Sequence, residues 1–239
     1  MPQIKYADMH CDTVTVCCDA GGNPDDFRGQ INLKKLRESG CSAQCFAIFT
    51  EGKNSAADFE RYAAFYRAQF INSPLILPVQ SCSDLEKAQN EGKIAAILTV
   101  ENLGFTGGDL SVIPDLKKLG VHMASLVWNN ANCFAYPNLI FEGGKPLFAA
   151  REERGLTALG KDAVRALNDN KIIVDISHLS DGGVEDVLDL STAPIVASHS
   201  NCAAVCGVCR NLTDGQLKKI AESGGVAGLN FCRDFVGGE

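Results

Sequence analysis

The sequence has no excess of basic residues. Among 239 residues, 22 lysines and arginines stand against 29 aspartates and glutamates, which gives a formal charge of -7 at pH 7. No cluster of lysine or arginine interrupts this acidic average. Because nucleic acids and anionic membranes attract positively charged surfaces, the composition argues against both as partners.

Long apolar runs are missing as well. A membrane-spanning helix needs about 20 consecutive apolar residues, and no stretch of the sequence approaches that length. The chain begins at Met1 without the basic start and apolar core of a signal peptide. We therefore expect a cytoplasmic protein without a membrane span.

A glycine-rich phosphate loop does not follow any early predicted strand. Such a loop marks the doubly wound open sheets that bind dinucleotides, so this alternative α/β fold is disfavoured. The length suits one large α/β domain, and we expect a single domain over residues 1–239.

Cysteine, in contrast, is abundant, with 11 residues. Without an export signal, free and mostly buried thiols are the expectation. The spacing Cys202-x3-Cys206-x2-Cys209 matches a pattern by which radical enzymes hold an iron–sulfur cluster. This triplet follows a late strand, whereas the pattern usually follows the first one, so the cluster is the less favoured interpretation.

Two apolar segments each end in a histidine. Ile172–Val174 runs into Asp175-Ile-Ser-His178, and Ile195-Val196 runs into Ala197-Ser-His199. A segment of helix length, Asp181–Leu190, separates them. This order predicts two neighbouring parallel strands with an imidazole at the carboxyl end of each, where α/β barrels carry their chemistry.

Polar residues also follow two earlier strands. The predicted strand Ile4–His10 runs into Cys11-Asp12, and the spacing of His10 and Asp12 places both side chains on the same side of an extended segment. Glu101 follows the apolar strand Ile94–Val100. Alone, Asp12 is also compatible with a helix cap, and Glu101 with a solvated loop charge.

The remaining pattern predicts further alternating strands and helices. Capping boxes are expected at Ser83–Glu86 and Thr213–Gln216, and a long loop at Ala131–Arg154. Seven strand–helix units are one short of a closed barrel. The sequence thus predicts an α/β fold, a TIM-type (β/α)8 barrel that lacks its eighth strand–helix unit and is incomplete at its carboxyl end. The other predicted elements are strands Ser42–Phe49, Met123–Val127 and Val226–Phe231 and helices Leu33–Ser39, Ala56–Phe70 and Thr157–Asn168.

The polar residues at strand ends form a candidate metal site. Nitrogen and oxygen ligands without thiolate suit Zn²⁺, Mn²⁺, Co²⁺ or Ni²⁺. Five ligands exceed what one catalytic ion usually takes, so two ions bridged by Glu101 fit best, and such a pair performs amide hydrolysis through a bridging hydroxide. The fourth histidine, His122, lies at the opposite end of its strand and is interpreted as structural. The five candidate ligands are His10, Asp12, Glu101, His178 and His199.

Taken together, these motifs resemble the membrane (renal-type) dipeptidase family and its bacterial zinc relatives, over the whole chain. The resemblance implies a barrel with two zinc ions, one held by His10 and Asp12, the other by His178 and His199. It also implies a bridging Glu101, an Arg210 that binds the substrate carboxylate, a dipeptide substrate and a homodimer. The motifs are His10-Cys-Asp12-Thr13, Glu101-Asn102, Asp175-Ile-Ser-His178-Leu-Ser180, Ser198-His199-Ser200 and Cys209-Arg210-Asn211.

The sequence departs from this family at two places. Where renal-type enzymes have a histidine that stabilises the oxyanion, it reads Trp128-Asn129-Asn130. Asn129 can donate a hydrogen bond to substrate but cannot carry a proton. No residue matches the catalytic aspartate after the eighth strand, so no catalytic residue is assigned and weak activity is expected. A different amide or lactam hydrolase and a non-catalytic metal-binding barrel stay open as alternatives.

Overall fold

A computed structural model describes residues 5–237. Ile4, the expected start of the first strand, and the terminal Gly238-Glu239 lie outside the described residues. The chain forms two compact units. The first runs to Val100 and includes Lys118–His122, and the second consists of Glu101–Lys117 and the chain from Met123 onward.

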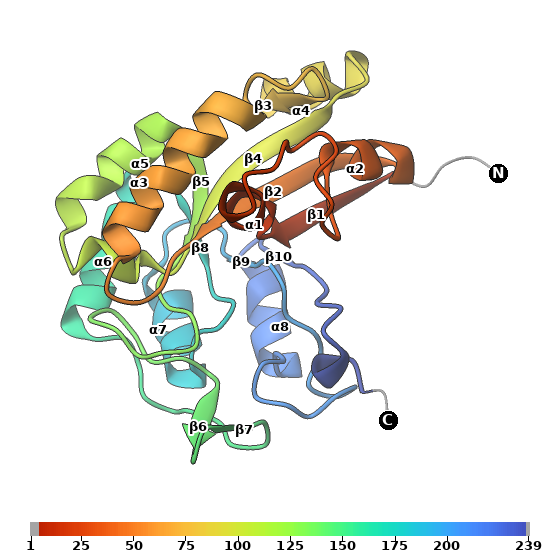
Figure 1. The fold of residues 1–239 in the computed structure, drawn as a ribbon. Helices are drawn as coiled ribbons and strands as arrows, with labels where there is room; N and C mark the ends of the chain where they lie inside the picture. The colour runs from red at the N-terminus through yellow and green to blue at the C-terminus, as the bar shows by residue number, and fades with distance from the viewer. Residues whose placement is uncertain (1–4, 238–239) are drawn as a thin grey trace. The chain divides into compact units, whose positions relative to one another are not determined.

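The first unit contains parallel strands connected by helices (Figure 1). β1 (Tyr6–Cys11) pairs with β2 (Cys41–Phe49), and β3 (Ile76–Pro78) pairs with β4 (Ile94–Glu101), whose last residue belongs to the second unit. β2 neighbours β4 in the sheet. The helices are α1 (Thr13–Asp19), α2 (Leu33–Ser39), α3 (Ser55–Phe65), the π-helical turn η1 (Tyr66–Phe70) and α4 (Cys82–Asn90).

Apolar sequence explains these elements. β4 is buried along nearly its whole length, as expected for a parallel strand that is covered on both faces. Phe46 of β2 packs edge to face against Phe70, with 5.2 Å between ring centroids. Gly40 ends α2 with a φ of 90°, a left-handed conformation that favours glycine.

The second unit contains four parallel strands in the order β5, β8, β9, β10. In this register Ser125 lies opposite Asp175, and Asp175 lies opposite Val196, so the carboxyl ends of three strands are level. The strands are β5 (Val121–Ser125, in this unit from Met123), β8 (Ile173–Asp175), β9 (Val196–Ala197) and β10 (Val226–Ala227).

Helices follow the strands of the second unit, as the alternating pattern predicted. The side chains of Thr157, Ser180 and Thr213 cap three of them. The helices are η2 (Leu103–Thr106), η3 (Leu110–Val112), α5 (Ile113–Leu119, ending in the first unit), α6 (Ala158–Asp169), α7 (Asp181–Leu190), α8 (Asp214–Glu222) and η4 (Arg233–Phe235).

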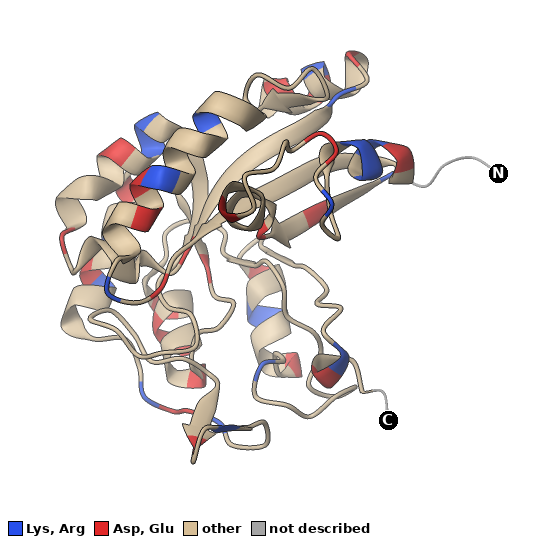
Figure 2. Cartoon of the chain, viewed as in Figure 1, with Lys and Arg blue, Asp and Glu red and all other residues tan. Residues whose placement is uncertain are grey.

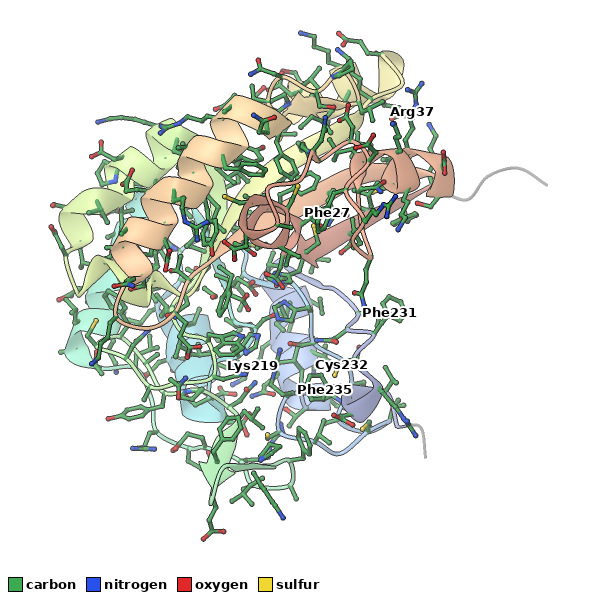
Figure 3. All side chains as sticks on the ribbon, viewed as in Figure 1. Phe27, Arg37, Lys219, Phe231, Cys232 and Phe235 are labelled. Carbon is green, nitrogen blue, oxygen red and sulfur yellow. The ribbon has the colours of Figure 1, made fainter. Side chains whose placement is uncertain are left out.

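The predicted α/β class is confirmed, because parallel strands alternate with helices in each unit. β10 is shorter than the predicted Val226–Phe231, since only two residues pair with β9. Phe231 is 87% exposed there (Figure 3). The second capping box, Thr213 with Gln216, is formed as predicted.

Two local predictions were wrong. The capping box of α4 pairs Ser81 with Asp84 rather than beginning at Ser83, because the helix starts at Cys82. The segment Ala131–Arg154 contains a hairpin, β6 (Ile140–Glu142) with β7 (Lys145–Leu147). Gly143 and Gly144, with φ of 57° and 78°, supply the positive dihedrals that a tight hairpin turn requires.

The surface charge follows the mixed composition. Figure 2 shows acidic and basic residues interspersed along α3 of the first unit and α8 of the second. Within residues 5–237, no helix has both the length and the apolar character to cross a membrane.

Candidate metal and substrate site

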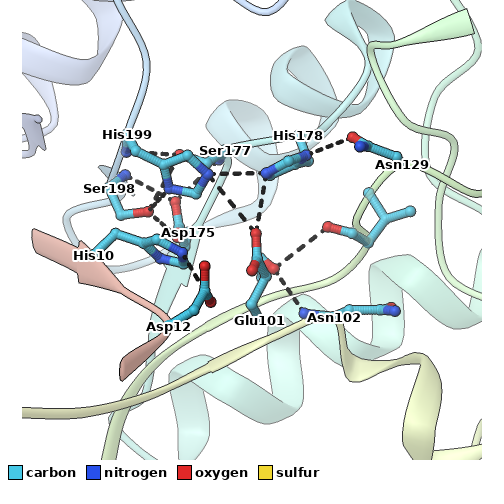
Figure 4. A network of polar contacts seen from close by, with 12 residues as sticks. His10, Asp12, Glu101, Asn102, Asn129, Asp175, Ser177, His178, Ser198 and His199 are labelled. Atoms are coloured by element: carbon cyan, nitrogen blue, oxygen red, sulfur yellow. Dashed lines mark hydrogen bonds and ion pairs between the residues drawn. The ribbon is translucent and has the colours of Figure 1, made fainter. Parts of the chain in front are cut away.

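His178 and His199 follow β8 and β9 and meet in the second unit (Figure 4). Their Nε2 atoms lie 2.9 Å apart. Oε1 of Glu101 is 3.0 Å from Nε2 of His178 and 3.7 Å from Nε2 of His199. All three side chains are at most 12% exposed. Three of the five predicted ligands therefore converge on one buried point.

The outer nitrogen of His178 faces an amide oxygen. Oδ1 of Asn129 lies 2.8 Å from Nδ1 of His178. An amide oxygen can only accept, so Nδ1 carries the proton and Nε2 presents its lone pair. The imidazole is thus held as the tautomer that binds metal through Nε2.

The chemistry of this donor set fits a divalent cation. Glu101, His178 and His199 offer a carboxylate and imidazole nitrogens, which borderline divalent ions such as Zn²⁺ prefer. Glu101 is 5% exposed, and a buried carboxylate requires a compensating positive charge or hydrogen bonds. These residues could therefore hold a metal ion.

His178 has a constrained backbone. Its φ of 71° is in the left-handed region, which is uncommon for residues other than glycine. The conformation is fixed from the segment before β6, where the N–H of Asn138 donates to the carbonyl of His178 at 2.7 Å. The N–H of Ser180 donates in turn to the carbonyl of Tyr136 at 3.0 Å. Such strain is typical of functional positions.

Asn102 fixes the chain directly after Glu101. It has a φ of 73°, and its N–H donates to Oγ of Ser125 at 2.9 Å. Its Oδ1 accepts from the N–H of Gly104 and from Nδ2 of Asn132, each at 3.0 Å. Asn102 had no predicted role beyond its place in the Glu101-Asn102 motif. Its contacts fix the chain at the end of β4.

Arg210 lies against the same cluster. It is 2% exposed, and its Nη2 lies 3.1 Å from Nε2 of His178. Its Nη1 has no hydrogen-bond partner among the described residues. The guanidinium carbon is 5.4 Å from the centre of the Phe235 ring.

Burial lowers the pKa of Arg210 to about 10, against the opposing effect of the Glu101 and Asp175 charges. The side chain nevertheless stays charged at neutral pH. A buried cation with an unused N–H group is suited to binding an anion.

The first unit brings His10 and Asp12 together at the end of β1. Nε2 of His10 lies 3.5 Å from Oδ1 of Asp12. Both residues line a cavity of about 740 Å³, together with Phe27, Arg28 and Ile31 from the loop before α2. The pair is therefore accessible to an ion and a small substrate.

His122 was predicted to have a structural role, and its contacts agree with this. Its Nε2 lies 2.8 Å from the carbonyl oxygen of Val79 in the first unit. This contact holds the ring at the start of β5, at the end opposite to the polar strand ends.

All 11 cysteines are free thiols as expected, but only five of them are buried, so the expectation of mostly buried thiols was wrong. Cys202, Cys206 and Cys209 contact three separate oxygens, which belong to Asp214, Asp234 and Leu147. Among residues 5–237, moreover, no group of three neighbouring ligand atoms that could hold one ion includes any of these sulfurs, which argues against an iron–sulfur cluster.

The sequence of the chain is similar to those of known dipeptidases. The chain is 31% identical over 220 residues to the uncharacterized dipeptidase C965.12 of Schizosaccharomyces pombe, covering 86% of this chain and 51% of that protein. It is 26% identical to the dipeptidase tcpJ of Claviceps purpurea, covering 86% and 50%. The chain thus spans about half the length of these curated relatives.

Solved structures of metallopeptidases are also similar to this chain. Dipeptidase AC, a metallopeptidase of family M19, superposes with a TM-score of 0.88 at 27% identity, covering 98% of this chain and 74% of that one. A metallopeptidase from Rhodobacter sphaeroides, solved with a phosphinate mimic of the dipeptide L-Ala-D-Ala, gives 0.85 at 26% identity, covering 98% and 75%. The model of the membrane dipeptidase family (peptidase family M19) matches residues 1–239. This chain belongs to the membrane dipeptidase family.

Proposed function

We propose that this protein is a metal-dependent dipeptidase that hydrolyses the peptide bond of dipeptides. The observation that carries the proposal is the buried convergence of Glu101 with His178 and His199, at 3.0 and 3.7 Å. Family membership and the dipeptidases among its relatives support the same activity.

Five residues are proposed as ligands of two divalent ions, with Zn²⁺ favoured and Mn²⁺, Co²⁺ or Ni²⁺ also suited. His10 and Asp12 would hold one ion and His178 and His199 the other, with Glu101 as the bridge. Each histidine is close to a second proposed ligand within its own unit. When bound, the ions would polarise the scissile carbonyl and activate water at neutral pH.

Arg210 is proposed to bind the carboxylate of the dipeptide. Its unused Nη1 and its burial support this role, because a desolvated guanidinium forms strong paired hydrogen bonds with a carboxylate. Binding the free carboxylate would select short substrates. It would also fix the distance from the carboxyl end to the scissile bond.

Asn129 is proposed to bind substrate as well. Its Oδ1 contacts His178, which leaves the two N–H groups of the same amide to donate to a substrate carbonyl. In this arrangement one side chain orients a metal ligand and a substrate group. A homodimer and a cytoplasmic location stay predictions from the sequence.

Metal content and hydrolysis test the proposal together. The protein is purified without chelator, its metal is measured by elemental analysis, and a panel of L,L and L,D dipeptides is assayed beside cyclic amides. We expect two equivalents of metal and weak hydrolysis of dipeptides, because no residue of the sequence matches the catalytic aspartate of the family. Turnover of cyclic amides alone would indicate a different amidohydrolase, and a folded protein that takes up no added metal would contradict the proposal.

A further inference from the structure

The second imidazole of the cluster is connected to a buried carboxylate through a serine. Oγ of Ser198 lies 2.7 Å from Nδ1 of His199 and 2.5 Å from Oδ2 of Asp175 (Figure 4). Asp175 and Ser198 are 6% and 2% exposed. The three residues form a continuous hydrogen-bonded chain whose carboxylate and hydroxyl are buried.

The direction of the hydrogen bonds in this chain follows from its partners. Oδ1 of Asp175 accepts the N–H groups of Ser177 and Ser198, each at 3.0 Å. Oδ2 lies closest to the Ser198 hydroxyl, and a carboxylate can only accept. The single hydroxyl proton is therefore donated to Asp175, because Oδ2 would otherwise face a hydroxyl lone pair at 2.5 Å. The other possible acceptors are farther away, Nδ1 of His199 at 2.7 Å and Oγ of Ser177 at 3.3 Å.

The proton of the His199 imidazole is then fixed as well. With its proton directed to Asp175, Oγ of Ser198 offers only lone pairs to Nδ1 of His199, so Nδ1 must carry the proton. Nε2 of His199 consequently presents a lone pair toward Nε2 of His178 and the Glu101 carboxylate. Neutral, metal-binding imidazoles are thus prepared on both sides of the cluster, by Asn129 for His178 and by Ser198 for His199.

We propose that Asp175 and Ser198 are positioning residues that hold His199 as its Nδ1–H tautomer and so prepare Nε2 to bind a divalent ion. This inference rests on the proposed function, because the ion is the one that the dipeptidase would use. Asp175 suits the role because it ends β8 opposite Val196 of β9, two residues before Ser198. One carboxylate therefore fixes the end of the neighbouring strand and the tautomer of its histidine.

Two variants and a matched control test the hydrogen-bonded chain of Asp175, Ser198 and His199. Ser198→Ala removes the hydroxyl, while Asp175→Asn keeps the shape but presents an N–H group to Ser198. Ser200→Ala is the control, because Ser200 is also buried and adjacent to His199, yet its hydroxyl contacts Oγ of Ser177 at 3.5 Å rather than the imidazole. Zn²⁺ affinity is measured by competition with a chromogenic chelator.

The tautomer is read separately by ¹⁵N NMR of the metal-free protein, at a pH well above the ordinary imidazole pKa of about 6.5. The chain has only four histidines, so the His199 signals can be assigned by single substitutions. Wild type should show protonated Nδ1. In Asp175→Asn the Ser198 hydroxyl should turn to donate to His199, and the proton should move to Nε2.

Loss of the hydrogen-bonded chain should weaken Zn²⁺ binding about 10- to 100-fold in Ser198→Ala and in Asp175→Asn. Ser200→Ala should bind Zn²⁺ with the affinity of the wild type. Wild-type affinity in Ser198→Ala, an equal loss in Ser200→Ala, or protonated Nε2 in the wild-type protein would overturn the inference. Failure of the wild type to bind Zn²⁺ would instead overturn the proposed function. The NMR result would still decide whether Asp175 and Ser198 fix the tautomer of His199.

Discussion

Nε2 of His178 and Nε2 of His199 lie 2.9 Å apart, so both imidazoles direct these nitrogens to the same point. The outer nitrogens of both rings face oxygens, at 2.8 Å for His178 and 2.7 Å for His199. The rings are thus oriented with their metal-binding atoms toward Glu101. Single substitutions in this cluster should therefore have separate effects on metal content and on dipeptide binding.

Removal of either histidine should remove metal. We expect His178→Ala and His199→Ala each to lower the bound metal from two equivalents to about one, because each loses one of the few ligands of one ion. Elemental analysis after purification without chelator measures this. His122→Gln is the control, since its ring contacts Val79 instead. Two full equivalents in His199→Ala would contradict the assignment.

Replacing Arg210 by lysine should affect dipeptide binding. Lysine keeps the charge but loses the forked geometry, and a lost charge-assisted hydrogen bond costs about 1.5–3 kcal/mol. We expect KM for dipeptides to rise roughly 10- to 100-fold with a smaller effect on kcat. Dipeptide amides, which lack the carboxylate, provide the control. If Arg210→Lys impaired amides and free dipeptides equally, Arg210 would not recognise the carboxylate.

Two glycines at equivalent helix positions should respond oppositely to alanine. A Cβ at Gly182 in the first turn of α7 would overlap the carbonyl oxygen of Glu153. A Cβ at Gly215 in the first turn of α8 would meet nothing closer than Oγ1 of Thr213 at 3.9 Å. In urea unfolding, Gly182→Ala should destabilise by about 1–3 kcal/mol. Gly215→Ala should stabilise by about 0.4–1 kcal/mol.

This pair separates two effects of the same substitution. Alanine always reduces the freedom of the unfolded chain, so the sign at Gly182 depends on the close approach of the backbone at Glu153. Equal effects at the two positions would show that this approach is not maintained in solution.

The capping box of α4 should make stability depend on acid pH. The N–H of Gln80, the N–H of Ser81 and the hydroxyl of Ser81 all donate to Asp84, which lowers the pKa of its carboxyl below 3.8. A lowered folded-state pKa stabilises the protein above the unfolded value, and this contribution is lost as the pH falls through the folded value. Asp84→Asn should therefore lower Tm at neutral pH.

The difference in Tm between Asp84→Asn and wild type should narrow as the pH falls from 3.8 through the lower folded-state pKa, because the carboxyl is then protonated first in the unfolded chain and finally in both. Thermal melting at neutral and acid pH measures this. Glu86→Gln, on the exposed surface of the same helix, removes a charge without altering the cap and serves as control. A constant difference across this range would contradict the capping role.

The sequence predicted the strands that carry His178 and His199 because apolar runs stop abruptly at polar residues there. It also predicted the helix Asp181–Leu190 with correct bounds. The hairpin of β6 and β7 was missed, since its strands are short and only Gly143-Gly144 indicates the turn. Pattern reasoning finds long periodic elements more readily than isolated turns.

The residues that orient the site were harder to predict from sequence than the ligands. Asp175 and Ser198 lie in the quoted motifs, but their partnership depends on the register of β8 with β9. The contact of Asn129 with His178 depends on two segments that are 49 residues apart. Such contacts are set by tertiary structure, which residue type and spacing do not specify.

The left-handed backbone of His178 links the proposed metal ligand to the segment Tyr136–Asn138 before β6. Because its carbonyl accepts from Asn138 and the neighbouring Ser180 donates to Tyr136, the imidazole cannot be displaced without loosening the chain before β6. Thermodynamic linkage makes this reciprocal, so an ion that fixes the ring also protects that segment from local unfolding. The rate at which a protease cleaves between Ala131 and Arg154 thereby becomes a measure of metal occupancy that needs no substrate.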